Sequence, residues 1–481
     1  MSSTPVRAHR PGLILALLAF AQLIIALDYN IVYVALPDIG GDLKFSDQTL
    51  QWVVSAYAVA YGGLLLLGGR ASDLFGRRRM FLFGLALYGL SSLAGGLAPQ
   101  AGVLLAARGV QGVGGAFLFP ATLSLVSTTF TEGRERNRAF AVWATAGAGG
   151  MVLGSLLGGV LTQAFGWSAV FFVNVPLALG GIVAAVMLLA PDGPILRGRS
   201  FDLPGALTAT AGTTLVVFAL VQGPESGWGS PGVAGAAAAG AALLAAFVTI
   251  ERRGRDPLMP LSLLRNRHLS AGIATAFLFM ATFGTLVYFL MVYFQTVRGY
   301  GPLRTGVAYL VPMAATVVGS NLGGALATRF GIRATLICGQ ALGAGGAVWL
   351  GLAMAPDGSY AALVGPMLVF SFGQGIVYTT LFAAASTGVP PHRQGVASGM
   401  TSTGLQVGSA VGLAVLVAIA NAGTGGRSGE ALRVAVTDGL RSAVLVTAAG
   451  IGVLILVALS FGRPAAPAPA AEEPAAPVGA S

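Results

Sequence analysis

Long apolar stretches, each long enough to cross a bilayer as a helix, alternate along the chain with short polar segments. A helix needs about 20 predominantly apolar residues to cross the hydrocarbon core, and apart from closed barrels only helices satisfy their own backbone polar groups there. Fourteen stretches meet this length. They lie near residues 12–36, 48–69, 80–98, 101–123, 139–162, 168–190, 205–222, 232–250, 269–292, 304–327, 333–354, 361–385, 395–420 and 441–461. The pattern predicts an all-α membrane protein with fourteen transmembrane helices.

The basic residues gather in every second polar segment. If the N-terminus is cytoplasmic, twenty of the 27 Lys and Arg residues lie in cytoplasmic segments and six outside, with Arg108 left inside a span. Cytoplasmic loops of membrane proteins carry an excess of Lys and Arg. We therefore expect a multi-pass protein of the cell (cytoplasmic) membrane with both termini in the cytoplasm.

The composition agrees with a protein surrounded by lipid. Charged residues make up 9% of the 481 residues and hydrophobic residues 55%, whereas soluble domains have about 25% charged residues. The net charge of +10 is scattered in short groups, and a nucleic-acid partner would need a clustered basic patch on a folded domain. We therefore expect no nucleic-acid partner. The single cysteine, Cys338, lies in an apolar segment, where we expect it to be buried.

The sequence also lacks the motifs of common enzymes. It contains no Walker phosphate loop, no metal-ligand pair and no nucleophile–base spacing. We expect neither catalytic residues nor a metal or organic cofactor, so an ion gradient must supply the energy for any work that the protein performs.

Two segments far apart in the chain share one pattern, Gly-Gly followed by five variable residues and Phe-Gly-X-Arg. The first covers residues 68–78 and the second residues 323–333, and Gln-Gly recurs in a similar way at 111–112 and 374–375. Parallel repeats related by an axis along the membrane normal are typical of transporters. The repeat predicts two six-helix halves with two further helices inserted between them.

These repeats divide the chain into four parts. We expect an N-terminal six-helix half at residues 1–200, a two-helix insert with a cytoplasmic loop at 201–262 and a C-terminal six-helix half at 263–462. The Ala/Pro-rich tail at 463–481 cannot bury a core and should be disordered.

Four motifs resemble the fourteen-span drug:proton antiporter branch of the major facilitator superfamily. Residues 69–79 are similar to the superfamily signature between spans two and three, and residues 108–112 to its span-four motif. Residues 27–37 resemble the span-one motif of the branch, and residues 201–205 open the insert as in this branch. The resemblance covers roughly residues 12–462 and implies the major facilitator fold.

The resemblance implies proton-coupled efflux of hydrophobic drug-like or antibiotic small molecules, powered by the proton gradient and carried out by a monomer. Two positions depart from the branch: Asn30 and Tyr33 stand where it usually has Thr and Asn. Span five also has Gly154-Ser155 where the antiporter motif usually has Gly-Pro, so an expected helix distortion is lost. That loss favours the alternative, a uniporter or proton-linked importer of a small metabolite, whereas the fourteen-span plan and Asp28 oppose it.

Asp28 and Arg108 are the charged residues that fall well inside predicted spans. A carboxylate at the centre of a membrane helix costs about 2.5–3.5 kcal/mol on insertion scales, and such residues are typical of proton relays. We predict that Asp28 binds the coupled proton; the alternative is an acid near the outer end that reaches the interface. Arg108 needs a carboxylate or carbonyl partner. The resemblance implies that it couples protonation to conformational change, and the alternative is a structural hydrogen-bond hub.

The segment with Gly69, Asp73, Gly76 and Arg77 forms a predicted gating loop. Gly76 permits a tight bend, and Asp73 can accept hydrogen bonds from a helix N-terminus or from an arginine. The resemblance implies a latch that holds the cytoplasmic side shut in the outward-facing state. The alternative is that the arginines serve only as topology anchors.

Small and aromatic residues in the spans suggest packing contacts and a cavity. Gly154, Gly158 and Gly159 predict either a sliding contact between the halves, which would be part of a conformational switch, or ordinary helix packing. An apolar aromatic cavity suits hydrophobic drugs, although such side chains also face lipid. The candidates for the cavity are Tyr29, Tyr33, Gln111, Phe117, Phe283 and Tyr288.

Overall fold

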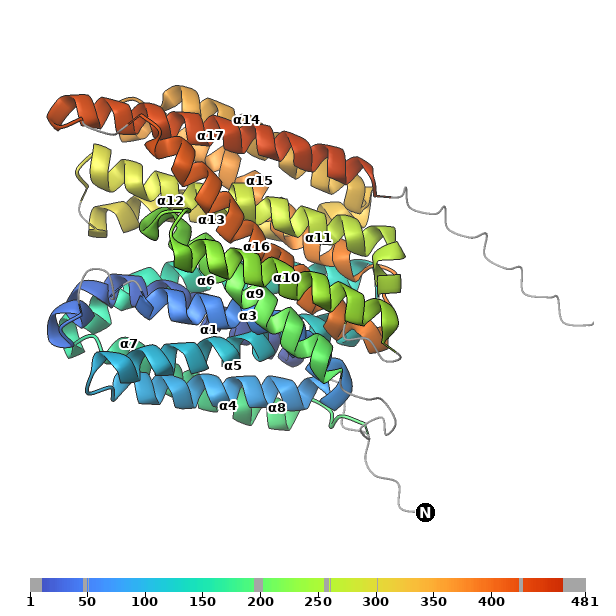
Figure 1. Ribbon diagram of the computed structural model, residues 1–481. Coiled ribbons are helices and arrows are strands. Elements are labelled where there is room, and N and C mark those ends of the chain that lie inside the picture. Colours follow the sequence, from blue (N-terminus) through green and yellow to red (C-terminus); the bar gives the residue numbers. More distant parts are fainter. Residues whose placement is uncertain are drawn as a thin grey trace, which may run out of the picture.

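The computed structural model describes residues 11–45, 50, 52–193, 202–254, 259, 261–300, 302–423 and 427–461. These residues form helices joined by short connections, with no strand among them, and the helices run roughly along one direction (Figure 1). The predicted all-α class is confirmed. The predicted disorder of the tail concerns residues outside the described ranges.

The first group of helices packs into one half of the bundle. It consists of α1 (Pro11–Asp42), α3 (Trp52–Phe75), α4 (Arg77–Gly96), α5 (Ala101–Thr129), α6 (Arg134–Phe165), α7 (Ala169–Phe172) and α8 (Asn174–Leu188). Helix α1 packs along α6, α5 packs against both α3 and α4, and α8 covers α4. We call this group the N-terminal half.

The last group of helices forms the C-terminal half. It consists of α11 (Arg267–Phe279), α12 (Thr285–Val292), α13 (Pro302–Phe330), α14 (Ile332–Ala353), α15 (Tyr360–Ser386), α16 (Gln394–Asn421) and α17 (Gly429–Leu459). Two π-helical turns, Met280–Gly284 and Tyr293–Val297, make α11 and α12 part of one continuous span. In Figure 1 this half, yellow to red, lies above the blue-to-teal N-terminal half.

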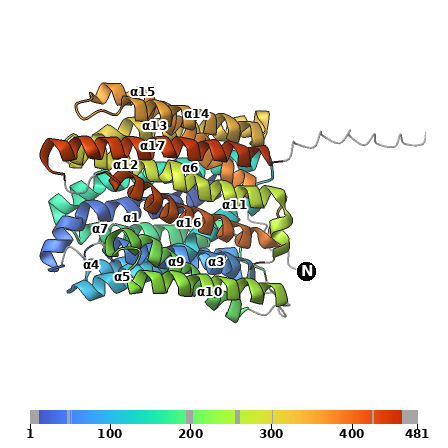
Figure 2. The same ribbon diagram turned by 45° about the horizontal axis from the view of Figure 1, so that its top comes forward.

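The remaining pair, α9 (Leu203–Ser226) and α10 (Pro231–Arg253), packs together where the halves meet. Helix α9 contacts α3 of the N-terminal half and α16 of the C-terminal half. In the turned view of Figure 2 the pair lies along one edge of the bundle, opposite α14 and α15. The domain boundaries of the sequence analysis stay a prediction.

Twelve helices of the described residues are long and apolar enough to cross a membrane. Two more, α4 and α9, lie in the same bundle, and with them the structure agrees with the fourteen spans that the sequence predicts. Several helices are longer than the apolar stretches that predicted them. Helix α17 begins at Gly429, twelve residues before the predicted span, because a helix continues into the polar interface whereas an apolar stretch ends at its edge.

Large apolar side chains cover the outside of the bundle. Leu90, Val160 and Phe165 are all more than half exposed, which suits a surface that faces lipid rather than water. Cys338 is also exposed, on α14, so the expectation that it is buried is wrong. An apolar segment alone does not say which of its faces turns toward the lipid.

Candidate functional site

Helices α1 and α5 bring the two charged residues of the predicted spans into direct contact. Arg108 Nη1 donates a hydrogen bond to Asp28 Oδ2 at 2.8 Å, and the two side chains are 1% and 0% exposed. Arg108 Nε donates to the backbone oxygen of Val53 at 2.9 Å. Asp28 therefore lies inside the bundle and does not reach the interface. Arg108 has both of the partners that its burial requires, a carboxylate and a carbonyl.

Two side-chain amides complete this buried network. Gln111 Nε2 donates to Asp28 Oδ1 at 2.8 Å and to Ser92 Oγ at 2.9 Å, while its Oε1 accepts from Arg108 Nη1 at 2.6 Å. Asn174 Nδ2 donates to Asp28 Oδ1 at 2.6 Å. Gln111 is 1% exposed, so in this conformation it belongs to the network rather than to an open cavity, because the one-turn spacing from Arg108 places both side chains on one face of α5.

Within the described part of the chain, the network contains an amide oxygen without a hydrogen-bond partner and borders on aromatic rings. The side-chain oxygen of Asn174 is buried and has no hydrogen-bond partner among the described residues. The guanidinium carbon of Arg108 lies 4.6 Å from the centre of the Tyr57 ring and 5.9 Å from that of Phe171, within the range of cation–π attraction. The charge of Arg108 is thus stabilised by a carboxylate on one side and by aromatic rings on the other.

Asn174, Ser92 and Tyr57 are members of the network that the sequence analysis did not identify. Asn174 carried a usable signal, because it is the only polar side chain in the apolar run 169–190, and an isolated amide in a membrane helix needs a partner. Ser92 and Tyr57 carried no such signal, since serine and tyrosine are common in membrane helices.

The predicted gating loop joins the two halves at one end of the bundle. Asp73 Oδ1 accepts from the backbone N–H of Gly395 at 3.0 Å, and Oδ2 accepts from that of Val396 at 2.9 Å. Both donors belong to the first turn of α16, where free N–H groups and the helix dipole favour an anion. The helix N-terminus that Asp73 was expected to cap therefore belongs to the opposite half.

Arg77 strengthens the same contact. Its Nη2 lies 3.5 Å from Asp73 Oδ1 and also donates to the backbone oxygen of Pro391, while its Nε donates to Ser124 Oγ at 2.7 Å. Gly76 has a φ of 106°, a conformation that permits the tight bend expected there. Arg77 thus contacts both halves, which a topology anchor alone would not require. We call the end of the bundle that contains these residues the Arg77 end.

The second copy of the repeat makes the equivalent contact with the first half. Asn137 Nδ2, near the start of α6, donates to Thr328 Oγ1 on α13 at 3.1 Å. A Cβ on Gly69 would lie 2.4 Å from the backbone oxygen of Gly395, and one on Gly324 would lie 2.8 Å from that of Asn137. The backbones of the two halves thus touch at both repeats, and the Arg77 end is closed.

An aromatic cluster continues this closure along the interface. The ring of Phe382 on α15 lies 4.9 Å from Trp143, 6.2 Å from Phe140 and 6.4 Å from Phe119, all on the N-terminal half. Tyr378 stacks on Trp143 at 6.2 Å. Aromatic pairs at such distances each contribute about 0.5–1.5 kcal/mol beyond their burial, so the cluster holds the halves together.

The glycines of α6 pack against a neighbour in their own half. A Cβ on Gly154 would lie 2.4 Å from the backbone oxygen of Leu27, and one on Gly158 would lie 2.9 Å from that of Ile31, both on α1. A Cβ on Gly159 would meet nothing within 4 Å. The sliding contact between the halves is therefore wrong for these glycines, and Gly159 takes no part in the packing.

The aromatic cavity candidates lie in separate environments. Tyr29 contacts Tyr57 of the network at 6.4 Å, and Tyr33 and Tyr288 are each 46% exposed. Phe283 is fully buried between other aromatic rings of the C-terminal half. Phe117 packs on the exposed Phe83 at 5.3 Å, away from the interface between the halves. Of these candidates, Tyr29 lies against the network, whereas Phe117 and Phe283 do not face a shared cavity in this conformation.

Comparisons with known proteins agree with this arrangement. The sequence profile described as Major Facilitator Superfamily matches residues 18–413. The puromycin resistance protein pur8 of Streptomyces alboniger is 37% identical over 92% of this chain and 89% of its own length. The cephamycin export protein CmcT of Amycolatopsis lactamdurans is 39% identical over 86% of each chain.

A solved structure shows the same fold. The proton:xylose symporter XylE, bound to 6-bromo-6-deoxy-D-glucose, matches with a TM-score of 0.67 at 14% identity, covering 92% of this chain and 95% of that one. A likeness at this identity concerns the fold and does not extend to the substrate.

Proposed function

Because the chain belongs to the major facilitator superfamily and is a membrane transporter rather than an enzyme, we propose that it exports hydrophobic antibiotic-like molecules in exchange for protons. The names of its relatives support export, since two of them are a resistance protein for puromycin and an export protein for cephamycin. The buried Asp28–Arg108 pair supports the proton coupling.

The Asp28–Arg108 pair is the observation that carries the proposal. Both side chains are almost completely buried in a membrane-spanning bundle, and removing one partner of a buried pair costs about 3–5 kcal/mol because the other charge stays unpaired. A proton that neutralises Asp28 likewise leaves the charge of Arg108 buried without a counter-charge. Protonation therefore forces the network to rearrange, which is what a carrier needs in order to couple a proton to a change of shape.

The side-chain oxygen of Asn174 can accept a hydrogen bond from the protonated Asp28. Once protonated, the Asp28 carboxyl becomes a hydrogen-bond donor, and Asn174, which now donates to it, has a buried side-chain oxygen without a partner in the described part of the chain. Rotation of the amide by half a turn presents this oxygen to the carboxyl hydrogen. Asn174 thus acts as a positioning residue that favours the protonated form after rotation.

We place the Arg77 end in the cytoplasm because most of the basic residues of the sequence lie on that side. The closed contacts of Asp73 and Arg77 with the start of α16 then correspond to a carrier shut toward the cytoplasm. In the proposed cycle a proton from outside reaches Asp28, the network rearranges and the Arg77 end opens. A substrate that binds from the cytoplasm then displaces the proton.

Everted membrane vesicles energised to be acidic inside test this proposal. A panel of dyes and antibiotics that includes puromycin and a cephamycin is added, and substrate-evoked proton release from the lumen is recorded. We expect release with some compounds and none with Asp28→Asn. The matched control is Asp38→Asn, which removes an exposed carboxylate from the same helix and should keep full release.

Two results would contradict the proposal. Full proton release by the Asp28→Asn carrier would remove Asp28 from the coupling. Tracer movement that ignores the pH gradient for every transported compound, with no proton release, would support a uniporter of a small metabolite instead.

A further inference from the structure

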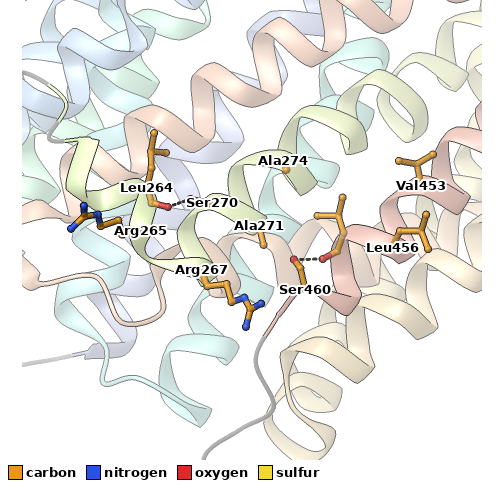
Figure 3. A pocket seen from close by; sticks show the side chains of 10 residues that line it. Leu264, Arg265, Arg267, Ser270, Ala271, Ala274, Val453, Leu456 and Ser460 are labelled. Carbon is orange, nitrogen blue, oxygen red and sulfur yellow. Dashed lines mark hydrogen bonds between the residues drawn. The ribbon is translucent and has the colours of Figure 1, made fainter. Parts of the chain in front are cut away.

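A groove opens between α11 and α17 of the C-terminal half, whereas the Asp28 network belongs to the N-terminal half. Its volume is about 690 Å³, within the range of small-molecule sites. Its lining comes from the turn before α11, the first two turns of α11 and the last two turns of α17 (Figure 3). The lining residues are Leu264, Arg265, Arg267, Ser270, Ala271, Ala274, Val453, Leu456, Val457 and Ser460.

One end of the groove carries two arginines whose positive charges are not balanced by a nearby carboxylate of the described residues. Arg265 and Arg267 are both exposed, and neither has a hydrogen-bond or ion-pair partner among the residues that the structure describes. The sequence has no Asp or Glu between residues 257 and 356 or between 439 and 471. In Figure 3 the guanidinium of Arg267 extends toward α17, whereas Arg265 points to the outer rim. An anion fits this end.

The other wall of the groove is apolar and open. Leu456 is 66% exposed and Val453 is 49% exposed, and together with Val457 they line the side of the groove formed by α17. At a rise of 1.5 Å per residue the wall from Val453 to Ser460 is about 10 Å long. An occupant must therefore offer an apolar segment beside its negative charge.

The groove lies where two membrane-spanning helices leave the hydrocarbon. Asn266, just before α11, donates its side-chain N–H to the backbone oxygen of Thr387 at the end of α15, and α17 ends at Leu459. These helix ends belong to the Arg77 end, since α16 begins nearby and Gln394 donates to Ser386 and Val389. The charge thus sits at the headgroup level, and the apolar wall points into the membrane.

We propose that this groove binds one anionic phospholipid, with its phosphate on Arg267, Arg265 adding charge at the rim and an acyl chain along Val453, Leu456 and Val457. Basic pockets between membrane helices on the cytoplasmic side are suited to such headgroups. Ser270 and Ser460 donate their hydroxyl hydrogens to backbone oxygens at 2.5 and 2.6 Å, so their oxygens are left to accept. A glycerol headgroup, which carries hydroxyl donors, matches both serines.

Lipid binding to the purified full-length carrier tests the site independently of transport. Dissociation constants are measured in detergent by native mass spectrometry for phosphatidylglycerol and for phosphatidylcholine with the same acyl chains. We expect phosphatidylglycerol to bind more tightly. Since each arginine near a membrane surface contributes about as much as a fivefold change in affinity, Arg267→Gln should weaken binding about fivefold. The Arg265→Gln/Arg267→Gln double variant should weaken it about thirtyfold.

Matched variants separate this groove from the general charge of the protein. Arg252→Gln/Arg253→Gln removes two exposed arginines at the end of α10 and should change the affinity less than twofold. Ala274→Trp fills the apolar floor and keeps both arginines, and it should weaken binding at least as much as the double arginine variant does. It serves as the test if the double arginine variant does not fold.

Three outcomes would overturn the proposal. Equal affinity for phosphatidylcholine would remove the role of the negative charge. If inorganic phosphate alone bound as tightly as phosphatidylglycerol does, the groove would be a simple anion site without a lipid. Unchanged phosphatidylglycerol binding in both the arginine double variant and Ala274→Trp would place any bound lipid elsewhere.

Discussion

Asp28 receives three hydrogen bonds from side chains of two helices, α5 and α8, and its carboxylate balances the charge of Arg108. In a low-dielectric interior, removing one member of a buried ion pair leaves the other charge uncompensated. The two charges therefore depend on each other, and replacing one residue destabilises the protein mainly because the other charge is left unpaired.

This dependence predicts the stability of paired variants. Arg108→Gln alone should lower the free energy of unfolding by about 3–5 kcal/mol, because it leaves the Asp28 carboxylate buried and unpaired. Adding Asp28→Asn to that variant should restore part of the loss, since two neutral amides remain. Thermal unfolding of the purified variants in one detergent measures both effects. Strictly additive losses would show that the two residues act separately.

The sequence predicted the charged members of the network but not their surroundings. Asp28 and Arg108 are conspicuous because a charge inside an apolar run has a cost that only a function or a partner offsets. Gln111 was identified as well but assigned to the cavity, since its environment depends on how α5 is rotated against α1 and α4. That rotation is set by side-chain packing along several helices, which a single sequence does not encode in any local pattern.

At the scale of elements, α6 and α1 form one tight pair because glycines on α6 admit the backbone of α1. Gly150, Gly154 and Gly158 recur every four residues, and a Cβ at each would lie within 3 Å of an α1 backbone oxygen. The spacing keeps them on one helix face. Membrane helices associate through such close backbone approach rather than through a hydrophobic driving force.

This pairing predicts opposite effects for two glycines that lie only five residues apart. Gly154→Ala should lower the thermal unfolding temperature, because its Cβ would meet the oxygen of Leu27 at 2.4 Å and overpacking costs about 1–3 kcal/mol. Gly159→Ala meets no neighbour and should stabilise α6 by about 0.5–1 kcal/mol through helix propensity. Equal shifts in the two variants would argue against the contact between α1 and α6.

Element boundaries were predicted less well than element number. Helix α4 carries Arg77, Arg78 and Arg79 in its first turn, and the apolar pattern therefore begins the span only at residue 80. The backbone N–H groups of Arg78 and Arg79 donate to the Asp192 carboxylate at 3.1 and 2.8 Å, which fixes the helix start. This cap comes from a residue more than a hundred positions away, so local sequence reading could not locate it.

At the scale of the whole molecule, the two copies of the repeat close the same end of the bundle with different chemistry. The first uses the carboxylate of Asp73 on the start of α16, and the second uses the hydroxyl of Thr328 with Asn137 on α6. The repeat predicted two related halves. It did not predict that each copy contacts the opposite half, because that contact depends on the conformation of the carrier.

If the halves must part at this end during transport, a covalent link across it should stop the cycle. Asn137→Cys and Thr328→Cys, introduced together with Cys338→Ser, should abolish substrate efflux after treatment with a short thiol cross-linker, and a cleavable linker should allow recovery on reduction. The matched control joins Asp357→Cys and Arg433→Cys, which lie within the C-terminal half and contact each other at 3.0 Å. Normal efflux by the cross-linked first pair would show that the Arg77 end stays closed throughout transport.

Among the residues that the structure describes, the side chains that donate hydrogen bonds to Asp28 all come from the N-terminal half, and the position of Arg108 in the repeat is occupied by the neutral Ser371 in the other half. The sequences of the two halves are therefore free to change independently of each other. If Asp28 carries the proposed proton, changes that preserve proton coupling are confined to the N-terminal half, whereas the C-terminal half is free to change its contacts with exported molecules. A chimera with the N-terminal half of this chain and the C-terminal half of a relative should keep its proton coupling and change the range of compounds that it exports. In such a carrier, resistance to a new compound evolves by changes in the C-terminal half while the Asp28 network stays as it is.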